Sequence, residues 1–257
     1  MNPTSIRGSW ASAAQGSIGA AIQQASARTG VDFNYLLGQA RIESGFDPNA
    51  RAKTSSATGL FQFIDQTWLG TVKQHGGNHG LGWAAEAIQR GPSGRYYVAD
   101  PGMRRAILDL RKDPAAASSM AAEFASDNQS YLENRLDRPM EAVDLYLAHF
   151  LGAGGAARFL KSHDADPNAP AASALPAAAR ANRWVFYNKD GSARSFAEIR
   201  DRYAAKLGGQ TGPLPSPGAR DFTNVRMAAL ETPKADIARP SPQYARLAYL
   251  MLAQLGG

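Results

Sequence analysis

The stretch FNYLLGQARIESG, residues 33–45, has the apolar spacing of one buried face of a helix and carries an acidic residue on that face near its end. Its apolar members share the i, i+3, i+4, i+7 spacing of such a face: Phe33, Leu36, Leu37 and Ala40. Glu43 comes seven residues after Leu36 and extends the same face. Partial burial favours the neutral form of a carboxylate, which is the form that a general acid needs. Glu43 is therefore the candidate catalytic acid of the chain.

Capping residues mark both ends of this helix. Asp32 is a favourable N-cap, and Gly45 is a favourable C-terminal stop. The polar residues 46–58 predict a loop, and a second helix is expected from Phe61 to His75, before two glycines. The candidate acid thus lies at the end of one helix, and a polar loop leads from it to the next.

The other segments with clear periodicity are also helical, so the sequence predicts a mainly α fold. No series of alternating apolar and polar residues predicts a strand. Trp68 and Trp83 are interpreted as core residues. The further helices are expected over residues 17–29, 83–88, 101–110, 114–128, 139–151, 156–162, 168–184 and 195–207.

Composition divides the chain into four parts. Residues 1–16 are rich in Ser, Ala and Gly and are expected to form a flexible N-terminal segment, followed by a helical domain over residues 17–207. Glycines and prolines mark residues 208–243 as a linker, and residues 244–257 have the spacing of an amphipathic C-terminal helix. This last helix either packs back on the domain or binds a partner from a flexible tether.

The chain of 257 residues carries a net charge of +6, which suits an acidic partner such as nucleic acid, anionic lipid or cell-wall polymer. Its basic residues are scattered and not interleaved with aromatic residues, so a nucleic-acid-binding module is not expected. No apolar stretch reaches the roughly 18 residues of a membrane span, and the N-terminus lacks the apolar core of a signal peptide. The chain is then cytoplasmic, exported by a non-standard route, or written without its signal.

The sequence indicates neither metal nor cofactor chemistry. It has no cysteine, which excludes disulfides, thiolate metal sites and cysteine nucleophiles. His75 and His79 flank glycines, but no further ligand spacing accompanies them. We expect no cofactor and no metal.

A second motif, ATGLFQF at residues 57–63, follows the loop after Glu43. A Glu-Ser pair that closes one helix, followed at this distance by Gly-Leu-Phe-Gln, resembles the soluble lytic transglycosylase (SLT) family of the lysozyme-like superfamily. The likeness is clear over residues 17–75 and weaker over residues 130–165. It implies a lysozyme-like helical catalytic domain with a cleft for peptidoglycan glycan strands. It also implies cleavage of the β-1,4 bond between N-acetylmuramic acid (MurNAc) and N-acetylglucosamine (GlcNAc).

The resemblance implies roles for single residues. Glu43 would be the catalytic acid/base, and Ser44 would orient it or contact the sugar. A local hydrogen bond at the helix end is the alternative role for Ser44. In the second motif, Gly59 and Leu60 would line the cleft and Gln62 would hydrogen-bond an N-acetyl group. Phe61, between them, would support substrate binding.

The chain departs from the family in the third motif, which is usually Ala-Tyr-Asn-Ala-Gly. The corresponding stretch is YLAHFLG, residues 146–152. The tyrosine that normally hydrogen-bonds the glutamate therefore has no clear counterpart, and Tyr146 and His149 are both candidates. They are three residues apart, so they are expected near one face of a helix.

The resemblance implies a glycan lyase in which Glu43 acts alone and the C6 hydroxyl of MurNAc attacks C1, leaving a 1,6-anhydroMurNAc end. Most glycosidases use two carboxylates. The nearby acids are interpreted otherwise, Asp47 as a turn former and Asp65 as a helix N-terminal residue. A muramidase of the same fold that uses water stays open, as does a wall-binding assembly factor.

The expected setting is the periplasm or cell envelope of a bacterium, with a phage lysis or virion enzyme as the alternative. Residues 208–257 are expected to recruit an envelope-spanning machine, such as a flagellum or a secretion system.

Overall fold

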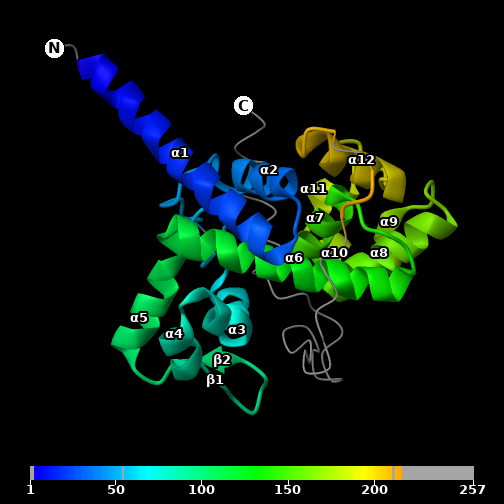
Figure 1. Cartoon of the computed structure of the whole chain (residues 1–257). Coiled ribbons are helices and arrows are strands. Elements are labelled where there is room, and N and C mark those ends of the chain that lie inside the picture. The colour runs from blue at the N-terminus through cyan, green and yellow to red at the C-terminus, as the bar shows by residue number, and fades with distance from the viewer. Residues whose placement is uncertain (1–2, 54, 210–211, 216–257) are drawn as a thin grey trace.

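The structure, a computed structural model, describes residues 3–53, 55–209 and 212–215, and these residues are mainly helical (Figure 1). This confirms the predicted fold class. The helices in chain order are α1 (Pro3–Thr29), α2 (Phe33–Ser44), α3 (Asp65–His75), α4 (Gly82–Ala87), α5 (Pro101–Asp109), α6 (Pro114–Leu136), α7 (Ala142–Leu151), α8 (Ala153–Ala165), α9 (Ala171–Ala174), α10 (Pro176–Ala181), α11 (Arg183–Phe186) and α12 (Phe196–Lys206).

Short elements connect some of these helices. Two 3-10 helices follow α3 and α5, namely η1 (Gly76–His79) and η2 (Leu110–Lys112). Strands β1 (Gln89–Arg90) and β2 (Tyr96–Tyr97) form an antiparallel hairpin between α4 and α5. The sequence did not predict this hairpin, because strands of two residues are too short to show alternation.

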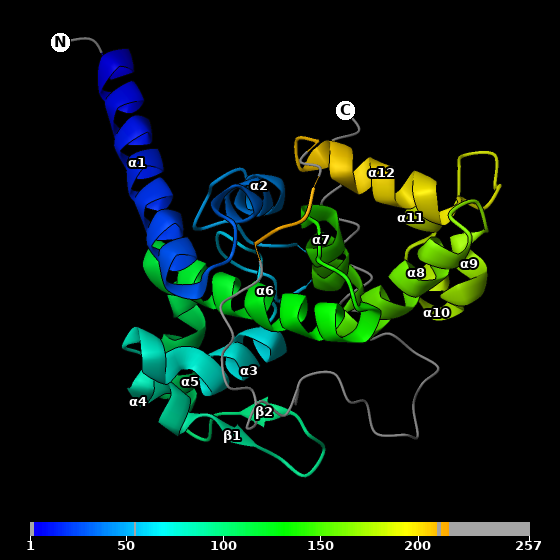
Figure 2. The same ribbon diagram turned by 45° about the vertical axis from the view of Figure 1, so that its right-hand side comes forward.

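Helix α6 is the central element of the fold. It contacts α1, α2, α3, α7 and α8. Figures 1 and 2 show α3, α4, α5 and the hairpin near its N-terminal end and α7 to α12 around its C-terminal half. Seven of its twelve buried residues are alanine or serine, and these small side chains let neighbouring helices approach closely. The two groups of helices are therefore held together by one long helix.

Helix α2 has both of the predicted caps. The Asp32 side chain accepts a hydrogen bond from the backbone N–H of Tyr35, 2.8 Å away. Gly45 ends the helix in the left-handed conformation, with a φ of 60°. These caps fix the position of the last helical turn, which carries Glu43.

The second predicted helix begins later than expected, at Asp65 instead of Phe61. Residues 59–62 form turns, in which Gly59 and Gln62 have φ angles of 85° and 48°. The guanidinium of Arg111 holds this region, donating hydrogen bonds to the carbonyl oxygens of Ser56 and Phe63 at 2.8 and 2.9 Å. This arginine is far away in the sequence, so helix periodicity alone could not place the turn.

The N-terminal segment also differs from the prediction. The first helix begins at Pro3, not at Ser17, so most of the segment expected to be flexible is helical. Proline suits the first helical position, where its missing N–H is not needed, and no further proline interrupts this helix. In Figures 1 and 2 the N-terminal part of α1 extends beyond the rest of the molecule.

Two later helix boundaries differ as well. Helix α6 continues to Leu136, beyond the predicted end at residue 128, because no glycine or proline interrupts it before the left-handed Asp137. Helix α7 begins at Ala142, not at Pro139, because the side chains of Glu141 and Asp144 form a capping box there.

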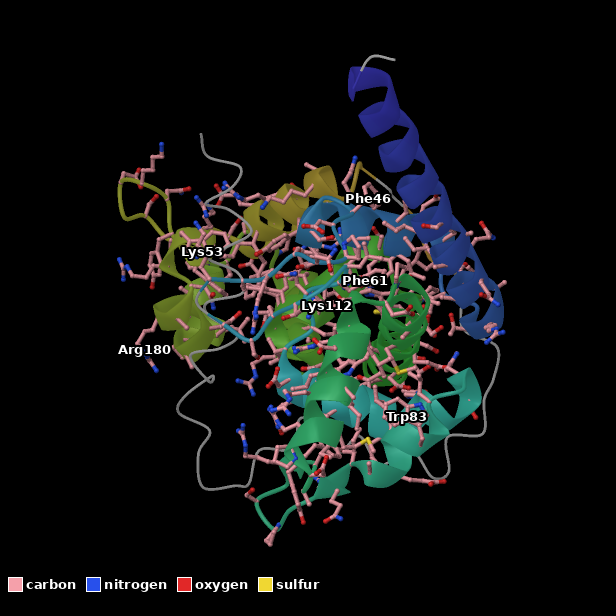
Figure 3. The ribbon with its side chains drawn as sticks, turned by 90° about the vertical axis from the view of Figure 1, so that its left-hand side faces the viewer. Phe46, Lys53, Phe61, Trp83, Lys112 and Arg180 are labelled. Carbon is pink, nitrogen blue, oxygen red and sulfur yellow. The ribbon has the colours of Figure 1, made fainter. Side chains whose placement is uncertain are left out.

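The two tryptophans that were interpreted as core residues differ in position. Trp68 is fully buried, and its indole N–H donates to the carbonyl oxygen of Ile107 at 2.7 Å. Trp83 is 45% exposed, and Figure 3 shows it on α4, well below Phe61 in that view. The prediction is confirmed for Trp68 and wrong for Trp83, because α4 is a short helix that buries little of its surface.

The chain returns to the domain after α12. The backbone N–H of Leu214 donates to the carbonyl oxygen of Met140 at 2.7 Å, and Pro213 pairs with Glu141. Leu214 also packs against the core. Residues 216–257, with most of the predicted linker and the predicted C-terminal helix, lie outside the described residues. Within the described residues, no helix is both long and apolar enough to cross a membrane.

Candidate active site

Glu43 lies in the last turn of α2 with its side chain fully buried. Neither carboxyl oxygen has a hydrogen-bond partner among the described residues. Buried polar groups are nearly always hydrogen-bonded, because leaving one unpaired is costly. A buried carboxyl group with free oxygens is therefore the strongest indication of a reactive site in the described part of the chain.

His149 on α7 is the polar neighbour of this carboxyl group. Its Nε2 atom lies 3.1 Å from Oε1 of Glu43. His149 Nε2 and Glu43 Oε1 are at hydrogen-bond distance, but their geometry is not that of a hydrogen bond. Neither atom therefore has a hydrogen-bond partner among the described residues. On the other side of the ring, Nδ1 lies 3.2 Å from the amide Nε2 of Gln39. The structure thus brings together Glu43 and one of the two candidates from the third motif.

Three buried tyrosines lie close enough to Glu43 for its charge to act on them: Tyr35, Tyr146 and Tyr203. Burial raises the pKa of each phenol, and the nearby charge of Glu43 raises it further. The ring of Tyr146 lies 6.0 Å from that of His149 and 5.2 Å from that of Tyr203. All three hydroxyl groups therefore stay protonated at neutral pH and can act as donors.

Sequence reasoning missed Tyr35, Gln39 and Tyr203. The first two could have been found, because Tyr35, Gln39 and Glu43 follow one another at intervals of four residues and therefore lie along one face of α2. Tyr203 comes from α12, and no local pattern in the sequence links it to Glu43.

Ser44 connects the helix end to the second motif. Its hydroxyl group lies 3.1 Å from the carbonyl oxygen of Ala40 and 2.9 Å from that of Leu60, and it donates toward both. The side chain thus holds the turn against α2. These hydrogen bonds fit the local helix-end role, which was the alternative to orienting Glu43 or contacting a sugar.

The second motif forms a tight turn beside α2. A Cβ atom at Gly59 would lie 1.9 Å from the carbonyl oxygen of Arg111, so only glycine fits there. Leu60 and Phe61 are fully buried in the hydrophobic core. For Leu60 this differs from the predicted cleft-lining role. The core supports the turn from within.

Gln62 uses its amide group to hold the same turn. Its NH₂ group donates to the carbonyl oxygens of Ala50 and Gly59, at 3.1 and 2.8 Å. Both protons are therefore occupied, and only Oε1 remains to accept a hydrogen bond from a ligand. Gln62 can accept a hydrogen bond from the N–H of an N-acetyl group. It cannot donate one to the carbonyl oxygen of that N-acetyl group without breaking a hydrogen bond that holds the turn.

The two acids weighed as a second carboxylate are both engaged. Asp65 pairs with Arg104 at 2.7 Å and with Arg111 at 2.9 Å, at the start of α3. Asp47 accepts a hydrogen bond from the backbone N–H of Asn49 in a turn. These are the structural roles that the sequence predicted for them.

The histidines near the glycine-rich segment form ion-pair contacts with α6. His75 Nε2 lies 2.8 Å from Asp127 Oδ2, and His79 Nε2 lies 2.7 Å from Glu123 Oε1. No group of three or more His, Cys, Asp or Glu side chains within the described ranges has the arrangement of a metal site. These histidines attach α3 and η1 to α6.

Residues 20–82 match the family model of the transglycosylase SLT domain. The match confirms the predicted resemblance to the SLT family and the lysozyme-like superfamily for this part of the chain. It contains Gln39, Glu43 and the turn of the second motif, whereas Tyr146 and His149 lie outside it. A domain of this family indicates a transglycosylase that acts on peptidoglycan in the cell envelope.

Proposed function

We propose that this chain is a peptidoglycan lytic transglycosylase that cleaves the β-1,4 bond between MurNAc and GlcNAc and leaves a 1,6-anhydroMurNAc end. The observation that carries the proposal is the buried carboxyl group of Glu43, which has no hydrogen-bond partner among the described residues and lies within the family match. Glu43 would be the single acid/base of the reaction.

The chemistry requires one group that first gives and then takes a proton. As the acid, Glu43 gives its proton to the glycosidic oxygen while the bond from that oxygen to C1 of MurNAc breaks. The acetamido group of the same sugar can stabilise the positive charge that develops at C1. Glu43, now a carboxylate, takes the proton of the C6 hydroxyl group as its oxygen bonds to C1. The acid is restored, GlcNAc leaves with a hydroxyl group, and no water is consumed.

The surroundings of Glu43 support transfer over hydrolysis. Most glycoside hydrolases use a second carboxylate, either to activate water or as the nucleophile. Asp65 is held by two arginines, and Asp47 accepts a backbone hydrogen bond within its turn. His149 and the three tyrosines offer hydrogen-bond donors near Glu43, and none of them is a carboxylate.

Analysis of the products tests the proposal. Purified sacculi are digested with the full chain, and the soluble fragments are identified by mass spectrometry. We expect 1,6-anhydroMurNAc ends with the wild type and no fragments with Glu43→Ala. Reducing MurNAc ends would identify a muramidase instead. Equal digestion by the wild type and Glu43→Ala would remove Glu43 from the mechanism, and binding to sacculi without cleavage would indicate a wall-binding assembly factor.

The tail is proposed to recruit an envelope-spanning machine, such as a flagellum or a secretion system, in a bacterial periplasm or envelope. Because residues 212–215 contact the domain, the deletion that tests this should begin at residue 216 and not at residue 208. We expect that removal of residues 216–257 spares cleavage of purified sacculi and abolishes co-purification with the machine. Loss of cleavage on sacculi would contradict this division of roles.

A further inference from the structure

Three polar side chains form a buried line from Gln39 through His149 to Glu43. Gln39 and Glu43 are four residues apart on the same face of α2, and His149 reaches between them from α7. The Gln39 Nε2 to His149 Nδ1 distance is 3.2 Å, and the His149 Nε2 to Glu43 Oε1 distance is 3.1 Å. Gln39 is buried, and its side-chain amide contacts the imidazole ring on the side opposite Glu43.

The amide group of Gln39 determines where the imidazole carries its proton. An NH₂ group is a donor only, so the Nδ1 atom that faces it must present its lone pair. A neutral imidazole with a lone pair on Nδ1 carries its proton on Nε2, the atom that faces Glu43. An imidazolium ion would place an N–H group at Nδ1 against the N–H of Gln39, which is unfavourable.

We infer that Gln39 is a positioning residue that keeps His149 neutral, with its proton on Nε2, the ring nitrogen that lies 3.1 Å from Oε1 of Glu43. The inference rests on the proposed function, in which Glu43 must be able to hold a proton. A cation at this distance would keep the carboxyl group ionised, whereas a neutral N–H group can hold the carboxylate without preventing its protonation. His149 thus provides a neutral donor at the position where the altered third motif lacks its tyrosine.

The other groups around the imidazole do not reverse this assignment. On α7 the neighbour is the phenol of Tyr146, which burial keeps protonated. On α6 it is the uncharged ring of Phe124, edge-on with ring centroids 6.4 Å apart. From α12, Tyr203 packs on Tyr146 and is also kept protonated by burial. Among these contacts Glu43 is the one acid that faces the ring.

The test is nuclear magnetic resonance of the full chain with ¹⁵N-labelled histidine, which distinguishes the two neutral tautomers and the cation. The signals of His149 are assigned by their loss in His149→Asn. We expect the neutral form with the proton on Nε2 throughout the pH range of activity. A wild-type spectrum that shows the proton on Nδ1, or the cation, overturns the inference.

Substitutions at Gln39 then connect the tautomer to catalysis. In Gln39→Glu a carboxylate accepts a proton from Nδ1, so His149 should become a cation. Cleavage of sacculi should fall on the order of tenfold, and the alkaline limb of the pH–activity profile should move to lower pH, because the cation favours ionised Glu43. Gln39→Met should give a mixture of tautomers and a smaller loss of activity.

A matched control and one further variant separate the possible failures. Gln129→Met replaces another buried glutamine, on α6, and should leave the His149 spectrum and the pH profile unchanged. If Gln39→Met also leaves the spectrum unchanged, Gln39 does not set the tautomer and the inference fails. If Glu43→Gln cleaves sacculi as fast as the wild type, the proposed function fails, whatever the spectra show.

Discussion

The segment that matches the SLT family and the helices from α7 to α12 make different contributions to the same site. Residues 20–82 supply Glu43, the turn of the second motif and Gln39. The later helices lie outside the match and supply His149, Tyr146 and Tyr203. The proposed reacting group thus comes from the part of the chain that matches the family model, and much of its surroundings from helices outside that match.

This difference suggests that the position of the proposed acid and the choice of its polar neighbours depend on different parts of the chain. A general acid needs a donor nearby that holds the carboxylate without remaining charged, and a phenol or a neutral imidazole can both do this. The N-terminal segment fixes where the carboxyl group lies, and the later helices determine which donor faces it. Variants in the two regions should therefore differ in whether they lose activity or stability.

The largest effect is expected from Glu43→Gln, in the family-matching segment. The amide keeps the size of the side chain and cannot supply the proton, so cleavage of sacculi should fall about 1,000-fold. The free energy of unfolding should not decrease, because a buried carboxyl group without a hydrogen-bond partner is replaced by a neutral group of similar shape. Urea denaturation and digestion of sacculi measure the two effects, and a large loss of stability would contradict the comparison.

A large loss of stability is expected instead from Asp144→Asn, at the start of α7. The carboxylate is fully buried, lies 2.8 Å from Arg138 Nη1 and 3.2 Å from Arg200 Nη2, and accepts the backbone N–H of Glu141. Removing one charge from such a network should cost about 3 kcal/mol.

Asp164→Asn is the matched control, because this exposed carboxylate also pairs with Arg138 and should contribute less than about 1 kcal/mol. Activity per folded molecule should remain in both variants. If Asp144→Asn abolished cleavage by fully folded protein, the helices from α7 to α12 would take part in catalysis and not only surround Glu43.

The sequence predicts the site well where contacts are local. The caps of α2 and the face that carries Glu43 follow from residues within one helix, and both are confirmed. The N-terminal ends of α5 and α6 were also predictable, because in each case an aspartate cap precedes a proline.

Prediction from the sequence fails where residues far apart in the chain determine the structure. The turn at Gln62 needs a left-handed φ of 48° that glutamine rarely adopts, and Arg111 stabilises that region from η2. The neighbours of Glu43 on α7 and α12 are likewise set by helix packing. Sequence reasoning could name Tyr146 and His149 as candidates, but only the structure could show that His149 lies 3.1 Å from the carboxyl group.

Gly59→Ala should show that the family-matching segment also depends on distant contacts. The new Cβ atom would overlap the carbonyl oxygen of Arg111, and the φ of 85° is unfavourable for alanine. We expect a loss of about 2 kcal/mol in the free energy of unfolding. Gly154→Ala, in α8 with no atom within 4 Å of the new Cβ, should instead be neutral or stabilise by roughly 0.5 kcal/mol. Equal effects at the two glycines would show that the turn can relax.

The smallest effect is expected at Lys206, the last residue of α12, where burial and the neighbouring Arg202 lower the pKa to about 8 while the charge of Glu43 opposes the shift. In the unfolded chain the pKa is about 10.4. Between these values the unfolded state binds more protons than the folded state, so this residue makes stability rise with pH from about 8 to about 10.4.

Lys206→Met removes that dependence. It should stabilise the protein at pH 7 by less than about 1 kcal/mol, because the ammonium group is partly in solvent and its charge is screened. The advantage should shrink at pH 9.5, where folded Lys206 is already neutral. Lys161→Met, at an exposed lysine on α8, is the control and should show no such difference. Urea denaturation at both pH values measures it. A constant difference between wild type and Lys206→Met would mean that Lys206 keeps an ordinary pKa, and that the charge of Lys206 can remain beside the site at alkaline pH.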